Sequence, residues 1–186
     1  MDMGHLHLML NHLPVLGAPA LLALLAWGLA GGIPTVTRGA LWLTVALAVV
    51  TGVVYLTGEA AEELVEGLPT FQERLVEYHE EVALWATLIL TATGCLAAAA
   101  LWRSRRWPTL SLTLTRVVLV GLLASTAAVG VTAWTGGPIG HPELRPGRTA
   151  AQKDLSGPPS RYHVPSRPSA VSAATTSLPA MATASR

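Results

Sequence analysis

The chain has 186 residues, of which 51% are hydrophobic and only 12% are charged. Average soluble domains carry about 25% charged residues, so this composition excludes both an ordinary water-soluble globule and an intrinsically disordered chain. The formal net charge of +1 and the thin spread of Lys and Arg also exclude a nucleic-acid-binding protein, and the sequence indicates a membrane protein instead.

Long uncharged stretches mark the predicted elements in chain order. We predict four transmembrane helices, at about 10–33, 38–57, 80–102 and 111–135. Each is close to the ~20 apolar residues that a helix needs to cross a hydrocarbon core about 30 Å thick. The predicted fold is therefore all-α, with an up-and-down four-helix transmembrane bundle over residues 1–146 and a short interfacial helix between the second and third helices. Residues 147–186, rich in Pro, Ser, Ala and Thr, are predicted to form a disordered tail.

The polar residues divide between the two ends of the predicted bundle. Eight of the eleven acidic residues lie between Glu59 and Glu81, and five of the six histidines belong to the same end. The other end carries arginines, with the densest group in the loop at 103–107. Because positively charged loops favour the cytoplasm, we expect a multi-pass protein of the bacterial inner (plasma) membrane with both termini on the periplasmic, extracytoplasmic side.

The N-terminal segment HLHLMLNHLP contains three of these histidines, His5, His7 and His12. On a continuous helix His5 and His12 share a face because they are seven residues apart, whereas His7 projects elsewhere. Histidines at a helix end also serve to solvate an interface, and this interpretation stays open for each of them taken singly.

The segment TGEAAEELVEGLP follows the second apolar run and carries four glutamates. The spacing of Glu59, Glu62, Glu63 and Glu66 places their carboxylates on one face of a short helix. A solvated helix face accounts for the last three of them. Glu59 differs because it directly follows the apolar run, where a carboxylate near lipid depth needs a partner.

Two further groups of polar residues border the apolar runs. His79 and Glu80 open the third run, and the sequence GGPIGHPE after the fourth run contains His141 and Glu143. We expect the paired glycines of that sequence to break the fourth helix, so that His141 and Glu143 fold back over the mouth of the bundle. Capping of a helix N-terminus is the competing interpretation for Glu80, and a flexible exit from the membrane is the one for His141.

Histidine and glutamate side chains that converge from separate helices are the material of a metal site. We therefore predict a protein, with no enzymatic activity expected, that binds a transition metal ion (Fe, Zn or Cu) at its outer face and has a redox or metal-handling role. The expected ligands are His12, Glu59, His79 and His141, with His5, His7, Glu63, Glu80 and Glu143 as secondary candidates.

Two alternatives stay open at this stage. In the first, His12 and His79 ligate a b-type heme in an electron-transfer subunit that works with other membrane redox subunits, although the many carboxylates favour a non-heme ion. In the second, the protein is a cofactor-free structural or accessory protein in which Glu59, His79 and His141 form a polar lid or a proton relay. The lipid bilayer is an expected partner in every case.

Four motifs of the chain resemble those of a family of small, functionally uncharacterised bacterial four-helix integral membrane proteins. The family patterns HLHLLLNHxP, TGExAEE, HE and GGxIxHPE are matched here by residues 5–14, 57–63, 79–80 and 136–143. Members of the family usually read GGEIRHPE at the last motif, so this chain departs from them at Pro138 and Gly140. The resemblance covers residues 4–146 and implies the four-helix membrane fold, but it implies no activity.

Overall fold

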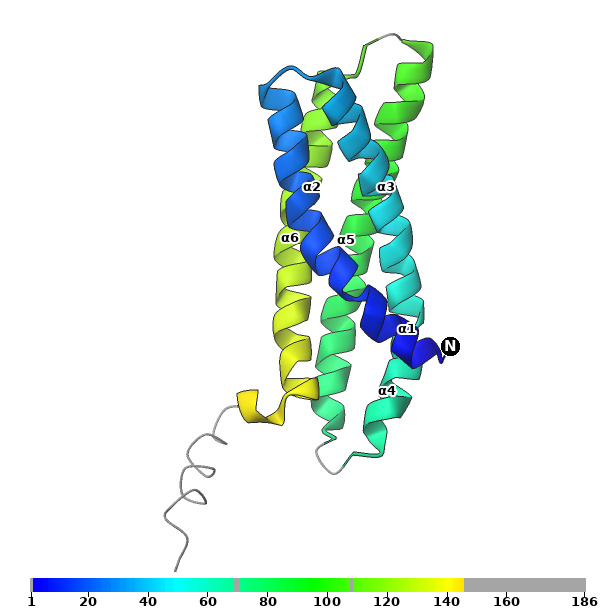
Figure 1. The fold of residues 1–186 in the computed structure, drawn as a ribbon, viewed down its shortest axis with the longest axis vertical. Coiled ribbons are helices and arrows are strands. Elements are labelled where there is room, and N and C mark those ends of the chain that lie inside the picture. Colours follow the sequence, from blue (N-terminus) through cyan, green and yellow to red (C-terminus); the bar gives the residue numbers. More distant parts are fainter. Residues whose placement is uncertain (1, 69–70, 108, 146–186) are drawn as a thin grey trace, which may run out of the picture.

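The protein is described by a computed structural model that covers residues 2–68, 71–107 and 109–145. Within these residues it is all-helical and contains no strand, as predicted (Figure 1). The predicted tail at 147–186 lies outside the described residues. The elements in chain order are α1 Met3–Leu10, α2 His12–Ala30, α3 Pro34–Leu56, α4 Gly58–Glu66, α5 Glu73–Arg106, α6 Leu112–Gly140 and the 3-10 turn η1 Pro142–Leu144.

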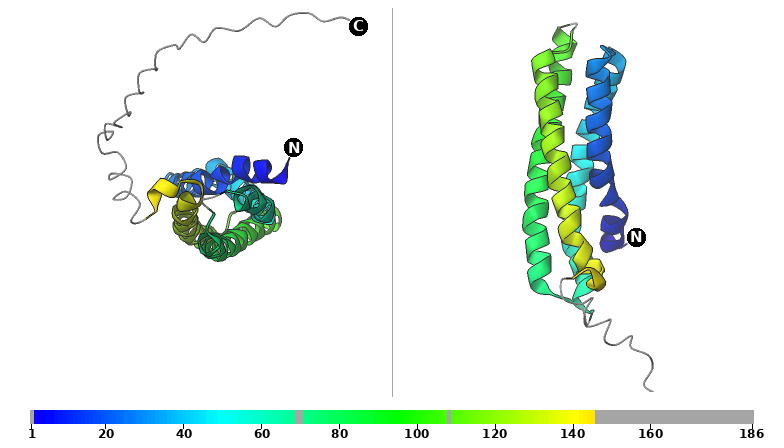
Figure 2. Two further views of the ribbon diagram at one scale, coloured as in Figure 1. Left: turned by 90° about the horizontal axis from the view of Figure 1, so that it is seen from below. Right: turned by 90° about the vertical axis from the view of Figure 1, so that its left-hand side faces the viewer.

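The four long helices α2, α3, α5 and α6 form a bundle. Helix α2 packs against α3 and α6, and α5 packs against the same two helices, so the four form a closed ring when viewed from one end (Figure 2). The connections from α2 to α3 and from α5 to α6 lie together at one end, which we call the arginine end (Figure 1). Helix α4, the start of α5 and the end of α6 lie at the opposite end, which we call the acidic end.

The bundle directs most of its apolar side chains outward. Four helical segments of the described chain are long and apolar enough to cross a membrane, namely Met3–Ala30, Pro34–Glu66, Glu73–Arg106 and Leu112–Gly140. No more than 39% of the most apolar stretch of each segment is buried inside the protein. Soluble monomers rarely expose apolar surface this extensive, so this is the surface expected of a multi-pass membrane protein.

Small residues set the spacing between the long helices. Gly94 on α5 lies directly against the side chain of Ala48 on α3. On the other side of α5, a Cβ atom at Gly121 of α6 would lie 2.6 Å from the hydroxyl oxygen of Thr93. The hydroxyl oxygens of Thr93 and of Ser125 on α6 lie 3.4 Å apart across the interface, and each hydroxyl donates to a carbonyl of its own helix at 2.8 Å. Close approach through small residues and hydroxyl groups is how helices associate in lipid, where the hydrophobic effect does not drive them together.

The first predicted helix, at about 10–33, corresponds to α2, and a further helix, α1, precedes it with a break at Asn11. Pro14, in the first turn of α2, has no N–H group to donate to the Leu10 carbonyl, and its ring crowds that carbonyl, so the chain kinks there. Helix α1 leaves the line of α2 and packs against α4 (Figure 1). His5 and His12 therefore belong to separate helices, so the condition under which they would share one face is not met.

Two further boundaries differ from those predicted. Helix α5 begins at Glu73, not near 80. The start was predicted from the end of the charged segment, but the charged turns before that point are helical as well. Its 34 residues span about 51 Å, more than a hydrocarbon core about 30 Å thick, so the charged start of α5 extends beyond the apolar segment. Helix α6 continues to Gly140, so the expected helix break at the glycines 136–137 is also wrong.

Candidate functional site

The acidic end brings side chains from five helices together, and His7 enters it from α1. Its Nδ1 atom lies 2.9 Å from the carbonyl oxygen of Val54 on α3 and 3.4 Å from the hydroxyl oxygen of Thr57. A carbonyl oxygen only accepts hydrogen bonds, so Nδ1 carries the proton and donates it. The neutral ring of His7 therefore has its lone pair on Nε2.

His79 enters the acidic end from α5 and is fixed in the same way against α6. Its Nδ1 atom lies 3.1 Å from the hydroxyl oxygen of Thr135, and that hydroxyl donates to the Thr132 carbonyl at 3.0 Å. The single hydroxyl hydrogen of Thr135 is thereby used, so the hydroxyl oxygen accepts from the Nδ1–H group of His79. His79 therefore also has its free lone pair on Nε2.

A glycine of α6 makes the position of the His79 ring possible. A Cβ atom at Gly136 would lie 2.9 Å from Cε1 of His79, which is closer than real Cβ contacts allow. The imidazole can therefore lie flat against α6 only because residue 136 has no side chain.

The charge of His7 affects the titration of His79. His79 lies three residues before the uncharged run that begins at Val82, and so belongs to the charged start of α5 outside the apolar segment. Burial of its ring and the nearby charge of His7 both lower the pKa of His79, and a hydrogen bond to Thr132 and the charge of Glu80 only partly oppose them. Near neutral pH the ring is therefore uncharged, with Nε2 available as a ligand or as a proton acceptor.

Glu62 on α4 and Glu80 on α5 form a second pair at this end. Burial raises the pKa of Glu62, and the charge of Glu80 and a hydrogen bond between the two carboxyl groups raise it further. Glu62 therefore takes up a proton more readily than an isolated glutamate does. We call His7, Glu62, His79 and Glu80 the polar cluster.

Several of the predicted ligands lie on the surface. His12, Glu59 and Glu63 are exposed. His5 is exposed as well, and its Nδ1 atom lies 3.5 Å from a carboxylate oxygen of Asp2. Of the predicted main ligands, only His79 is part of the polar cluster, and His7 takes the place beside it that was expected for His12.

His141 and Glu143 form a separate surface pair after α6. The Nδ1 atom of His141 lies 3.0 Å from Oε1 of Glu143, and both side chains are largely exposed. Hydrogen bonds from the backbone N–H of Glu143 itself and from His141 lower the pKa of Glu143. Because the two residues satisfy each other at the surface, their interaction does not extend into the polar cluster.

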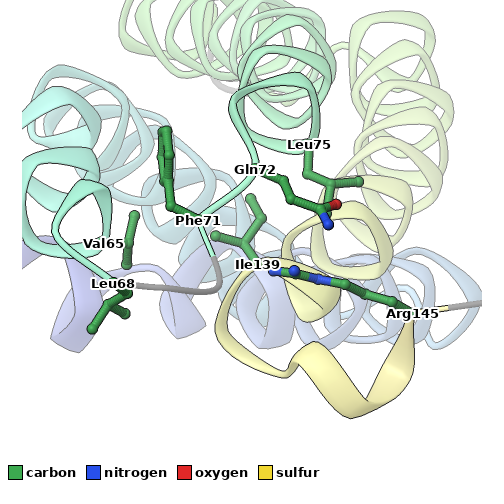
Figure 3. Close-up of a pocket in the computed structure, with 7 residues that line it drawn as sticks. All are labelled: Val65, Leu68, Phe71, Gln72, Leu75, Ile139 and Arg145. Atoms are coloured by element: carbon green, nitrogen blue, oxygen red, sulfur yellow. The ribbon is translucent and has the colours of Figure 1, made fainter. Parts of the chain in front are cut away.

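Apolar side chains fill the acidic end next to the helix connections. Figure 3 shows a cavity of about 10 Å³ there, which has room for about one water molecule. It is lined by Val65, Leu68, Phe71, Gln72, Leu75, Ile139 and Arg145. Arg145 folds back over the end of α6, and its Nε–H donates to the Pro138 carbonyl at 2.9 Å. A cavity of this size is far too small for a porphyrin.

In the part of the chain that the structure describes, no three His, Cys, Asp or Glu side chains converge closely enough to hold a metal ion. Two electrostatic interactions link polar side chains at this end, because the charge of His7 lowers the pKa of His79 and Glu80 raises the pKa of Glu62. From the sequence, Glu62 was interpreted as part of a solvated helix face. Its interaction with Glu80 was missed because Glu80 lies on another helix. Pro14 was the sequence feature that could have pointed to His7, because the kink at Pro14 turns α1 toward the polar cluster.

No protein-family model matches the chain, and neither does any curated protein or solved structure. The resemblance carried by the four motifs therefore stays a prediction. What the polar cluster can do follows from its own geometry.

Proposed function

We propose that this is a multi-pass membrane protein that binds a transition metal ion at its acidic end, with Nε2 of His7 and Nε2 of His79 as ligands. The observation that carries the proposal is that both rings donate Nδ1–H to fixed acceptors and keep Nε2 free. Metal-binding histidines are held in this way, because the outer hydrogen bond fixes the tautomer and the orientation of the ring. Imidazole nitrogen suits zinc, copper and iron.

Glu62 and Glu80 supply the carboxylate ligands in this proposal. A divalent cation would be attracted by these two carboxylates, whose mutual repulsion contributes to the raised pKa of Glu62 in its absence. Rotation of these side chains toward the imidazoles completes a set of two nitrogen and two oxygen donors. Two histidines with carboxylates in a helical bundle are also the ligand types of non-heme iron sites.

Asn11 adds a polar group on the same face as His7. The two residues are four apart, and the backbone N–H of Asn11 donates to the His7 carbonyl, so their side chains lie one helical turn apart. Oδ1 of Asn11 is buried and has no hydrogen-bond partner among the described residues. It is placed to accept a hydrogen bond from a water molecule bound to the ion.

We place the acidic end on the periplasmic side of the bacterial plasma membrane, with a redox or metal-handling role and no enzymatic reaction. The heme alternative has less support, because carboxyl groups such as those of Glu62 and Glu80 lie at this end and a porphyrin pocket prefers apolar walls. The cofactor-free alternative uses the same four residues as a proton relay, and it differs from the metal proposal in having no affinity for an ion.

Metal titration of the purified protein tests the proposal. The full chain is extracted in mild detergent, stripped with a chelator, and titrated separately with Zn²⁺, Cu²⁺ and Fe²⁺. We expect a saturable site for at least one ion, and an affinity at least about tenfold lower in the double variant His7→Gln/His79→Gln. The visible spectrum is recorded on the protein as isolated, and a Soret band would replace the metal ion with a heme.

The matched control is the double variant His5→Gln/His12→Gln. It removes two imidazoles from the same N-terminal segment, but both of these side chains are exposed. We expect it to bind like the wild type. Equal loss in both double variants, or no saturable binding by the wild type, would contradict the metal proposal, and the second result would leave the proton relay.

A further inference from the structure

The arginine end has a groove of its own, at the opposite end of the bundle from the polar cluster. It lies between the end of α5 and the start of α6 and has a volume of about 360 Å³, within the size range of small-molecule sites. Its lining residues are Ala99, Trp102, Arg103, Arg106, Trp107 and Leu114. The groove thus combines two guanidinium groups, two indole rings and an apolar edge.

The two arginines of the groove are oriented by the two tryptophans. The guanidinium carbon of Arg106 lies 4.9 Å from the centre of the Trp102 ring, and that of Arg103 lies 5.8 Å from the centre of the Trp107 ring. Stacking of this kind holds the guanidinium plane while its N–H edges stay free to donate. The stacking restricts the motion of both guanidinium groups, and both remain available as hydrogen-bond donors.

No carboxylate of the described residues pairs with either arginine. The ion pairs found among those residues are His5 with Asp2 and His141 with Glu143, both at the acidic end. The other acidic residues of the described chain lie between Glu59 and Glu81, also at that end. The two guanidinium groups of the groove are therefore available to an anion from outside the bundle.

The position of the groove along α5 identifies the source of that anion. The uncharged run of α5 ends at Trp102, and Trp102 and Trp107 are about 60% exposed, as is typical of indoles at a membrane–water interface. Ala99, which lies one helical turn before Arg103 toward the apolar middle of α5, forms the apolar edge of the groove together with Leu114 of α6. A ligand in the groove therefore meets positive charge at one end and an open apolar surface at the other.

We propose that this groove binds an anionic phospholipid. Arg103 and Arg106 donate hydrogen bonds to the phosphate group, and charge-assisted bonds from guanidinium groups to phosphate are among the strongest that proteins make. The rings of Trp102 and Trp107 flank the glycerol region, and Leu114 contacts the start of an acyl chain. Basic pockets between membrane helices on the cytoplasmic side hold such headgroups. The proposal depends on membrane insertion and is independent of the metal site.

Lipid retention measured by native mass spectrometry tests this proposal. The full chain is incubated in detergent micelles that contain equal amounts of phosphatidylglycerol and phosphatidylcholine. We expect the wild type to retain phosphatidylglycerol in clear preference to phosphatidylcholine. The double variant Arg103→Gln/Arg106→Gln should lose this preference and keep the melting temperature of the wild type, because both side chains are exposed.

The control is the double variant Arg38→Gln/Arg105→Gln, which removes the same charge from the same end without changing a residue that lines the groove. We expect it to keep the preference for phosphatidylglycerol. Equal loss in both variants would overturn the proposal, because it would show a general attraction to the basic surface. Equal retention of the two lipids by the wild type would also overturn it. Displacement of phosphatidylglycerol by inorganic phosphate at equal concentration would overturn it too, by showing a site for free phosphate.

Discussion

Thr135 determines which nitrogen of His79 is free. Its hydroxyl oxygen accepts the Nδ1–H group of the ring, and the substitution Thr135→Val removes that acceptor while keeping the shape of the side chain. The ring can then rotate and exchange tautomers, so the proposed metal site loses its fixed Nε2 donor. Removing such an outer hydrogen bond costs about 10–100-fold in metal affinity, and we expect a loss in that range by calorimetric titration.

Thr132→Val is the matched control for this substitution. Thr132 lies on the same helix, and its hydroxyl donates to the Ala128 carbonyl within α6, whereas its own carbonyl, which accepts from Thr135, is unchanged by the substitution. We expect wild-type metal affinity for this variant. Similar losses in both valine variants would show that α6 was disturbed as a whole and that the Thr135 hydroxyl has no specific role.

Gly136 gives a second prediction at the scale of one residue. In Gly136→Ala the new Cβ atom would lie 2.9 Å from Cε1 of the His79 ring, which is already hydrogen-bonded to Thr135. Displacing a packed side chain costs about 1–3 kcal/mol, and we expect the free energy of unfolding in detergent to fall by that amount.

The control is Gly130→Ala on the same helix, where nothing lies within 4 Å of the new atom. Alanine should stabilise that position by about 0.5–1 kcal/mol. Equal effects at the two positions would show that the ring is not held against α6.

Among the elements, α1 depends on its contact with α4. A Cβ atom at Gly4 would lie 2.5 Å from Cδ1 of Leu64 and 2.6 Å from the backbone oxygen of Ala60, and a backbone atom cannot move aside easily. We therefore expect Gly4→Val to lift α1 off α4 and to take His7 away from the polar cluster. Hydrogen exchange of the amides in α1 should become faster while exchange in α5 and α6 stays slow.

The control for Gly4→Val is Met3→Val, which places the same β-branched residue at the neighbouring position of α1. The Met3 side chain is 54% exposed, so its replacement should leave the contact with α4 intact. Unchanged exchange in the Gly4 variant would mean that α1 is not held by this contact. Fast exchange in both variants would mean that valine unfolds α1 through its low helix propensity alone.

The four long apolar helices could be predicted from the sequence because lipid thickness fixes the length of an uncharged run. The ends of the helices could not be predicted in this way, since charge marks where a chain leaves lipid and a helix can continue beyond that point. Helix α5 is already helical from Glu73, before its apolar run begins. Helix α6 stays helical through Gly136, against which the His79 ring packs. Composition therefore predicts the spans, and packing determines the boundaries.

The acidic end as a region rich in His and Glu could also be predicted, but the partners within it could not. Spacing along the chain favoured His12, whereas the Pro14 kink turns α1 so that His7 lies near His79. The pairing of Glu62 with Glu80 depends on the path of α4 relative to α5. Both facts are relations between helices, and no periodicity within one segment contains them.

At the scale of the whole molecule, the two ends of the bundle have opposite chemistry. The acidic end combines the polar cluster with the surface pair of His141 and Glu143, and the arginine end has stacked guanidinium groups. In the core between them, buried hydroxyls hydrogen-bond to carbonyls of their own helices, as Thr44 does to the Ala40 carbonyl at 2.8 Å. Among the described residues, the carboxylates therefore lie at one end of the bundle and most of the arginines flank the other end.

This asymmetry predicts the orientation of the protein. In the sequence, five arginines flank the apolar runs at the arginine end, and four basic residues, Arg74, Arg145, Arg148 and Lys153, lie within counting range on the other side, so the difference is small but favours a cytoplasmic arginine end. The N-terminal segment before Arg38 contains no Lys or Arg, which favours its export. Reporter fusions at Ser104 and Gly67 should therefore report opposite compartments, with Ser104 in the cytoplasm. Two reporters in one compartment would contradict the crossing of α5. Opposite compartments with Ser104 outside would reverse the orientation, and would place the groove of Arg103 and Arg106 in the outer leaflet.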